Sequence, residues 1–149
     1  MKKIRMAQLQ DADAIIEFQI KMALETEDFV LDKETVRSGV NAIFSDPNKG
    51  NYFVCYDDSR IIASLLITPE WSDWRNGFVW WIQSVFVISE YRKQGVFAAM
   101  YQFIKTELEK NESVMGLRLY VEKNNLRAQN VYKKMGMNAD HYDLYEWMK

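Results

Sequence analysis

The residues best suited to chemistry lie in a short stretch, Arg92–Met100, between an apolar run and a periodic helix. Basic residues and a glycine stand directly before the predicted helix start. The first backbone N–H groups of a helix have no intrahelical partner, and the helix dipole makes that end positive. Gly95 would let an anion approach the backbone closely. The turn predicts a site for a phosphate-bearing cofactor; the alternative is a plain loop with a surface Arg-Lys pair.

Two common phosphate-binding motifs are excluded by the residues of this turn. Gly95 is not followed by Lys-Ser or Lys-Thr, as a P-loop requires. The dinucleotide fingerprint needs three glycines in a G-x-G-x-x-G frame, and only one is present.

A second pattern follows about thirty residues downstream, and this spacing leaves room for one helix and one strand between the two patterns. Leu117–Val121 alternates like a half-buried strand. A helix is predicted next, with Asn125 as its N-cap and Gly136 as its C-cap. One face of that helix, which suits a cleft or a core, carries Ala128, Val131, Tyr132 and Met135.

Taken together, the two patterns resemble the GNAT family of N-acetyltransferases. The family has [Arg/Gln]-x-x-Gly-x-[Gly/Ala] at the start of a helix, and later Asn-x-x-Ala-x-x-x-Tyr-x-x-x-Gly-[Phe/Met]. The matching residues here are Arg92, Gly95 and Phe97, then Asn125, Ala128, Tyr132, Gly136 and Met137. The resemblance is strongest over residues 78–140 and extends more loosely to the whole chain.

Phe97 departs from the family pattern, which has glycine or alanine at that position. Its side chain either turns into the core or crowds the cofactor. An apolar stripe at helical spacing favours the core and consists of Phe97, Met100, Tyr101, Ile104 and Leu108.

The resemblance implies a fold, a reaction and a cofactor. The fold is α/β (α+β), the single-domain acyl-CoA N-acyltransferase fold over residues 1–149. Its mixed central sheet would have about six or seven strands, with helices on both faces. The cofactor would be acetyl-CoA (CoA), and the acetyl group would pass to a primary amine of a small molecule. A non-catalytic acyl-CoA-binding or interaction module with a degenerate site is the alternative.

The resemblance also implies roles for individual residues. The strand before the turn would pair with the pantetheine arm, and the turn would hold the diphosphate. Asn125 would contact the pantetheine arm, and Tyr132 would protonate the leaving sulfur. A phenol is a suitable donor, with a pKa near 10, although Tyr132 also suits a core position. The implied cofactor-binding residues are Val85, Phe86, Val87, Arg92, Lys93, Gln94, Gly95, Val96, Phe97, Ala98, Asn125 and Ala128.

The acceptor side is expected at a tryptophan-rich segment and at two polar residues, Glu25 and Gln83. Trp71 and Trp74 are expected in a loop, where aromatic faces suit an amine through cation–π contact. They suit a subunit interface equally well, and a homodimer is expected. The general base is left open among Glu25, Glu27, Asp28, Glu70, Asp73 and a water relay.

Composition excludes several classes of protein. The chain has 149 residues and a net charge of −2, so nothing suggests a nucleic-acid or polybasic membrane binder. No apolar run is long enough to cross a bilayer. His141 is the only histidine, which excludes a histidine-rich metal site. Cys55 is the only cysteine, so no internal disulfide forms and a reducing, cytoplasmic setting is expected.

The remaining elements follow from periodicity and breakers. Strands are predicted at Lys3–Ala7, Tyr52–Tyr56, Ile61–Ile67 and Phe78–Ile88, with one or two more within 138–149. Helices are predicted after N-caps at Asp11 and Asp32 and over Phe97–Leu108.

Overall fold

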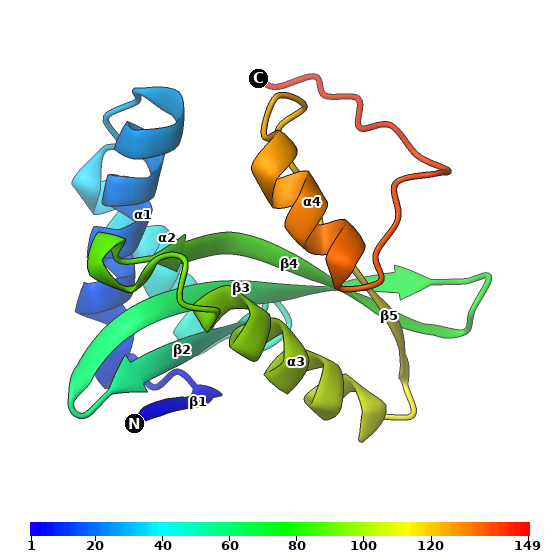
Figure 1. Ribbon diagram of the computed structural model, residues 1–149, viewed down its shortest axis with the longest axis horizontal. Coiled ribbons are helices and arrows are strands. Elements are labelled where there is room, and N and C mark those ends of the chain that lie inside the picture. Colours follow the sequence, from blue (N-terminus) through cyan, green and yellow to red (C-terminus); the bar gives the residue numbers. More distant parts are fainter. The chain divides into compact units, whose positions relative to one another are not determined.

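The computed structural model describes residues 1–149, which form two compact units, Met1–Arg118 and Leu119–Lys149 (Figure 1). The single domain predicted over the whole chain stays a prediction.

The first unit contains a mixed sheet of five strands in the order β1-β2-β3-β4-β5. Neighbours are antiparallel except β4 and β5, which are parallel. The strands are β1 (Lys2–Met6), β2 (Asn51–Asp57), β3 (Arg60–Ser72), β4 (Gly77–Val87) and β5 (Val114–Arg118). The helices are α1 (Ala12–Glu27), α2 (Lys33–Ser45) and α3 (Val96–Glu109), with short 3-10 turns at Leu9–Asp11 and Ser89–Tyr91. The α/β class and mixed sheet are confirmed.

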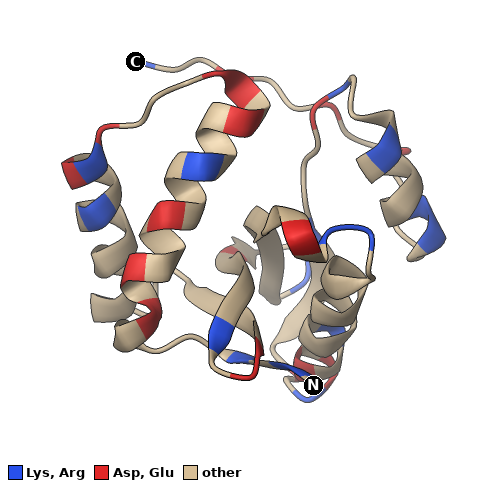
Figure 2. Cartoon of the chain, turned by 60° about the vertical axis from the view of Figure 1, so that its left-hand side comes forward, with Lys and Arg blue, Asp and Glu red and all other residues tan.

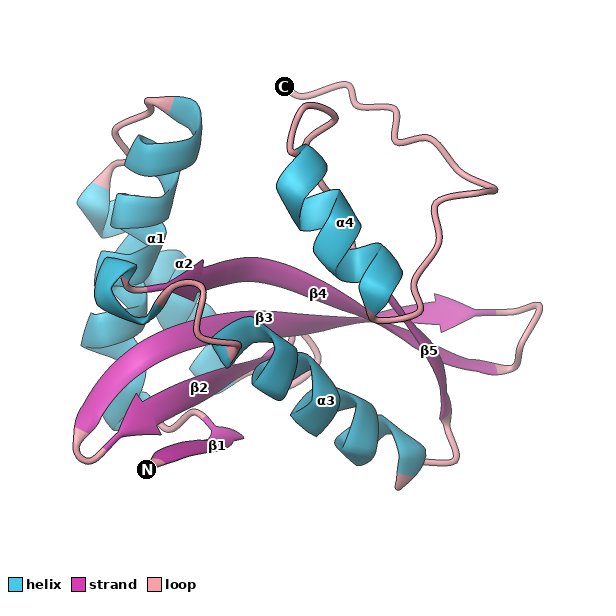
Figure 3. Cartoon of the chain, viewed as in Figure 1, coloured by secondary structure: helices cyan, strands magenta, loops and turns pink.

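The second unit contains one helix, α4 (Leu126–Lys134), and no strand. Residues 138–149, where one or two strands were predicted, have no regular structure and are drawn as loop after α4 (Figure 3). The prediction of six or seven strands is therefore wrong for this structure, which has five. A strand needs a neighbour to bond its backbone, and no strand pairs with this segment. Alternating apolar residues alone cannot supply that partner.

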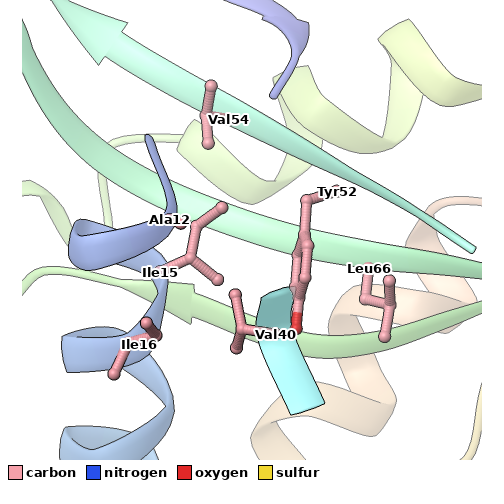
Figure 4. Packing of buried hydrophobic residues seen from close by; sticks show 7 residues of the cluster. All are labelled: Ala12, Ile15, Ile16, Val40, Tyr52, Val54 and Leu66. Carbon is pink, nitrogen blue, oxygen red and sulfur yellow. The ribbon is translucent and has the colours of Figure 1, made fainter. Parts of the chain in front are cut away.

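Helices cover both faces of the sheet, because adjacent side chains on a strand point to opposite sides. Tyr52, Val54 and Leu66 pack in one cluster with α1 and α2 (Figure 4). Phe53, between two of them on β2, points the other way. Its ring lies 6.1 Å from that of Phe103 on α3. The predicted helices on both faces are confirmed.

A β-bulge interrupts the pairing of β3 with β4. Two residues of β4, Ser84 and Val85, lie opposite the single residue Leu65. Ser84 takes a left-handed backbone conformation, with φ of 50°. The extra residue resets the alternation, so that Gln83 and Phe86 both face α1 although they are three positions apart.

Asp11 anchors the start of α1 to β1, but not as the predicted N-cap. No side chain caps α1. The Asp11 carboxylate instead accepts two hydrogen bonds from Arg5, at 2.6 and 3.0 Å, and one from the Gln8 backbone at 2.7 Å. Burial alone would raise the pKa of Asp11, but the bonds from Arg5 and Gln8 outweigh it and the pKa lies below its usual value. Asp32 caps α2 as predicted, accepting from the Thr35 backbone at 2.8 Å.

Asp11→Asn should lower the free energy of unfolding by about 1–3 kcal/mol, because it leaves Arg5 without its charged partner. A folded pKa below the usual 3.8 makes this contribution fully present above that pH and lost as the pH falls through the folded value. Asp13→Asn is the control, because Asp13 is exposed and pairs with Arg37 at 3.3 Å. Urea unfolding of both variants at neutral pH should show a loss of less than about 1 kcal/mol for the control. Equal losses would mean that Asp11 does not anchor α1.

Candidate active site

One edge of β4 is open along its second half. β4 pairs with β5 only from Phe78 to Trp81, because β5 ends at Arg118. From Ile82 to Val87, β4 pairs with β3 on one side and with no strand on the other. The predicted pantetheine-binding residues, Val85, Phe86 and Val87, all lie on this open part. An extended ligand with amide groups can bond to such a backbone edge as a further strand would.

The open edge leads into the turn that was predicted to bind phosphate. Gly95 precedes α3 with φ of 73°, and Lys93 is also left-handed, with φ of 63°. A left-handed residue before a helix brings consecutive N–H groups to one side, as in anion-binding nests. No side chain caps α3, and nothing lies within 4 Å of where a side chain on Gly95 would begin. The turn thus presents unobstructed backbone donors at a positive helix end.

Phe97 lies at the margin of the core, and not in it as predicted. The buried stripe of α3 begins one residue earlier and consists of Val96, Met100, Tyr101 and Ile104. Phe97 is half-buried, and its ring lies 6.4 Å from that of Tyr101. Because α3 starts at Val96, this residue takes the core position at i, i+4 spacing and turns Phe97 away from the middle of the stripe.

Arg92 is engaged by neighbours outside the turn. Its Nη2 lies 2.6 Å from Oε2 of Glu25, in the last turn of α1. Its Nε donates to the Val87 carbonyl at 2.8 Å, and its guanidinium lies 5.4 Å from the centre of the Phe86 ring. The structure therefore brings Glu25, a predicted acceptor-side residue, to the end of the open edge of β4.

Lys2 also reaches the turn, which sequence reasoning missed. Its ammonium donates to Oε1 of Gln94 at 3.2 Å, and the Gln94 amide donates to the Glu90 carbonyl at 2.7 Å. The two partners are 92 positions apart, so no local pattern could have revealed the contact.

The face of β4 beneath α1 is partly polar. Gln83 is half-buried and donates to Oγ1 of Thr68 at 2.6 Å. Nearby on this face, the rings of Phe18 and Phe86 lie 5.0 Å apart. Two further polar groups were missed by the sequence analysis: the Nε2 of Gln19 and the Oγ of Ser64 are buried without a hydrogen-bond partner. Buried polar groups that lack a partner are uncommon in folded proteins and mark this layer as unusual.

The two tryptophans that were predicted to lie in a loop are at the opposite end of β4. β3 runs to Ser72, so Trp71 stands in the strand and pairs with Phe78, not in a loop as predicted. Trp74 lies in the hairpin and is 88% exposed. The nine residue-to-residue steps from Phe78 to Val87, at roughly 3.3 Å each, span about 30 Å of extended strand. The structure does not bring Trp71 and Trp74 together with Glu25.

In the second unit, both predicted caps of α4 are present. The Asn125 carboxamide oxygen accepts from the Ala128 backbone at 3.1 Å, and Gly136 follows the helix with φ of 88°. Ala128, Tyr132 and Met135 form the less exposed face. Burial raises the pKa of the Tyr132 phenol above its usual value.

The lone cysteine is buried, and the acidic, histidine and cysteine side chains form no metal site. Cys55 is buried in β2, and burial raises the pKa of its thiol. No group of three or more histidine, cysteine, aspartate or glutamate side chains is arranged to hold a metal ion. None of the helices has the length and apolarity needed to cross a bilayer.

Comparison with known proteins agrees with this geometry. Residues 6–137 match the model of the Acetyltransferase (GNAT) family. A streptothricin acetyltransferase from Escherichia coli is 24% identical over 127 residues, covering 83% of this chain and 70% of the relative. The crystal structure of a possible acetyltransferase from Clostridium difficile 630 is 40% identical, with a TM-score of 0.93 over 100% of this chain and 98% of that one.

A more distant structure shows the same fold with a ligand. It is a predicted acetyltransferase from Clostridium acetobutylicum, solved with acetyl-CoA. That protein is 18% identical, with a TM-score of 0.76 over 98% of this chain and 96% of its own. The open strand edge, the uncapped helix start and the family match lead to one conclusion: the chain is a member of the GNAT family of acetyltransferases, which use acetyl-CoA.

Proposed function

We propose that this protein transfers the acetyl group of acetyl-CoA to the primary amine of a small molecule. The observation that carries the proposal is the continuity of two features. The open edge of β4 ends at Val87, and Arg92, in the turn before α3, donates to the Val87 carbonyl at 2.8 Å. Acetyl-CoA has two parts that match these features in the same order. Its amide-containing arm matches the open edge, and its diphosphate matches the turn.

The arm of the cofactor would bond to the backbone of Val85, Phe86 and Val87. The diphosphate would accept hydrogen bonds from the N–H groups of the turn, where the helix dipole also favours negative charge. The residues proposed for this second contact are Lys93, Gln94, Gly95, Val96, Phe97 and Ala98. Arg92 completes the proposed set in the first unit. In the second unit, the family motif alone assigns Asn125 and Ala128 to the cofactor.

The bulge of β4 suits the chemical step. Attack of a neutral amine on the thioester carbonyl creates an oxyanion, which needs a hydrogen-bond donor. The extra residue of a bulge is not paired with the neighbouring strand. Its backbone N–H, in Ser84 or Val85, is the donor that we assign to the oxyanion. Collapse of the tetrahedral intermediate then breaks the C–S bond and releases the thiolate of CoA, and the nitrogen loses a proton to water to give the amide.

Tyr132 is the proposed general acid for the thiolate. Its raised pKa keeps the phenol protonated at neutral pH, which a proton donor requires. Because α4 belongs to the second unit, this role rests on the family motif and on the state of the phenol.

Gln83 and Glu25 are the proposed acceptor-binding residues, since Gln83 faces α1 and Glu25 lies in its last turn. The streptothricin acetyltransferase among the relatives is named for a small-molecule acceptor. Trp71 and Trp74 stand too far along β4 to contact the same small amine as Glu25. We assign them to contact with a second copy, and the homodimer and the cytoplasmic location stay predictions.

Gly95→Ala should abolish the stabilisation that CoA and acetyl-CoA give to the wild type. A methyl group at a φ of 73° strains the turn and lies where the diphosphate would approach. In a thermal unfolding assay, either ligand at about a hundred times its Kd should add about 2.7 kcal/mol to wild-type stability. ATP and NAD should add much less.

Gly39→Ala, within α2, is the matched control, because its added methyl group meets no atom within 4 Å. It should keep the full response to CoA. If CoA fails to stabilise the wild type, the half-exposed Phe97 closes the diphosphate site and the non-catalytic module replaces this proposal.

Tyr132→Phe should slow acetyl transfer by about a hundredfold or more while leaving the Kd for CoA nearly unchanged. The change removes the acidic proton and keeps the ring. Release of CoA thiol, measured at saturating acetyl-CoA with the best amine from a screen, gives the rate. Tyr145→Phe is the control, because Tyr145 is 91% exposed in the same unit. Equal rates for the two variants would remove Tyr132 from the acid role.

A further inference from the structure

Arg92 has contacts that a purely cofactor-binding arginine would not need. The guanidinium is bonded to Glu25 at 2.6 Å and to the Val87 carbonyl at 2.8 Å. Both contacts draw the side chain back towards α1 and β4 and not towards the N–H groups before α3. Yet Arg92 stands only three residues before Gly95, within the segment that would receive the diphosphate.

Glu25 has a physical reason to hold a cation. The C-terminal end of a helix carries negative potential, so acidic side chains there are unfavourable and basic ones are favourable. The last turn of α1 has no basic residue. Acidic residues outnumber basic ones along α1, as Figure 2 shows, with four carboxylates and one lysine between Ala12 and Glu27. Arg92 supplies from another element the positive charge that this turn lacks.

We propose that the Arg92–Glu25 ion pair is a latch that the cofactor opens. The diphosphate draws the guanidinium of Arg92 towards the turn before α3, and the released carboxylate of Glu25 then binds the ammonium group of a cationic acceptor. This inference rests on the proposed function, because it assigns the diphosphate to the turn and Glu25 to the acceptor.

The latch is weak enough to open. The Arg92 side chain is 41% exposed and that of Glu25 is 45% exposed, and ion pairs this accessible to water contribute little. A diphosphate carries more negative charge than one carboxylate and would sit beside the positive end of α3. Charge-assisted bonds from arginine to phosphate are among the strong hydrogen bonds of proteins. The competition therefore favours the cofactor.

The latch also gives binding an order. With Arg92 in place, a cationic acceptor meets a carboxylate that is already neutralised. After the cofactor binds, the same carboxylate is free. Cofactor and acceptor therefore increase each other's affinity, and linkage requires that increase to be equal in both directions. Arg92 acts as a positioning residue that connects the two sites. The acceptor it predicts is an amine that binds in its protonated form and loses one proton to water before it attacks.

The first test is a double-mutant cycle on the Kd for CoA, measured by isothermal titration calorimetry. Glu25→Gln should bind CoA about two- to fivefold more tightly than the wild type, because Arg92 no longer has to leave a charged partner. Arg92→Gln should bind CoA more weakly. In the Arg92→Gln background, the further change Glu25→Gln should have no effect on CoA binding.

Glu90→Gln controls for the simple loss of one negative charge near a polyanion. Glu90 lies in the 3-10 turn after β4 and pairs with Arg60 at 3.1 Å. Glu90→Gln therefore removes one negative charge, as Glu25→Gln does, but leaves the Arg92–Glu25 pair intact. An equal gain for Glu25→Gln and Glu90→Gln, or a gain that persists without Arg92, would overturn the latch. Absence of wild-type CoA binding would instead overturn the proposed function on which the latch rests.

Hydrogen–deuterium exchange gives a readout that a merely structural ion pair would not produce. On addition of CoA, amides of residues 93–99 should become protected. Amides of residues 23–28, at the end of α1, should exchange faster because the tie to Arg92 is released. Glu25→Gln should show the faster exchange of 23–28 without CoA. Slower or unchanged exchange of 23–28 in the CoA-bound wild type would overturn the latch.

Discussion

The pairing of the parallel strands β4 and β5 ends at Trp81 and Arg118, and the rest of the site depends on the open edge that this leaves on β4. A buried strand normally bonds on both edges, and an edge left open must find another partner. β4 is paired with β3 on both sides of the bulge in its second half, so it stays extended although its other edge is open. Because the turn before α3 comes soon afterwards in the chain, the open edge continues into a positive helix end. The proposed place of the extended, anionic cofactor rests on this continuity.

Under the proposed function, the same strand serves two ligands in different ways. Its edge is the proposed contact of the cofactor, whereas its face beneath α1 is the proposed contact of the acceptor. The bulge at Ser84 and Val85 lies where the open edge and the face beneath α1 adjoin, and it turns both Gln83 and Phe86 to the side of α1. Packing of Phe18 on Phe86 fixes α1 over that face. The ion pair between Arg92 and Glu25 is the proposed connection of the two sites, and it runs through side chains alone, without any rearrangement of the core.

Most local features of the site were predicted from sequence, with Asp11 as a cap of α1 an exception, and contacts between distant residues were not. The turn at Gly95 and the caps at Asp32 and Asn125 depend on residues within one helical turn, so a short pattern contains them. The bulge, the contact of Lys2 with Gln94 and the pairing of Trp71 with Phe78 depend on strand register, which residues far apart decide together. The strands predicted within 138–149 failed for the same reason, since alternation signals a strand only where a partner edge exists.

The left-handed backbone of Ser84 has an evolutionary consequence. A non-glycine residue with φ of 50° in the middle of a strand carries strain that the surrounding pairing must hold. Substitution at this position over time should pass among residues that tolerate such a backbone, namely glycine, asparagine, aspartate and serine. β-branched residues, which ordinarily dominate strands, should be rare there. Among descendants of this chain, the bulge would thus appear as one position with loop-like composition inside an otherwise apolar strand.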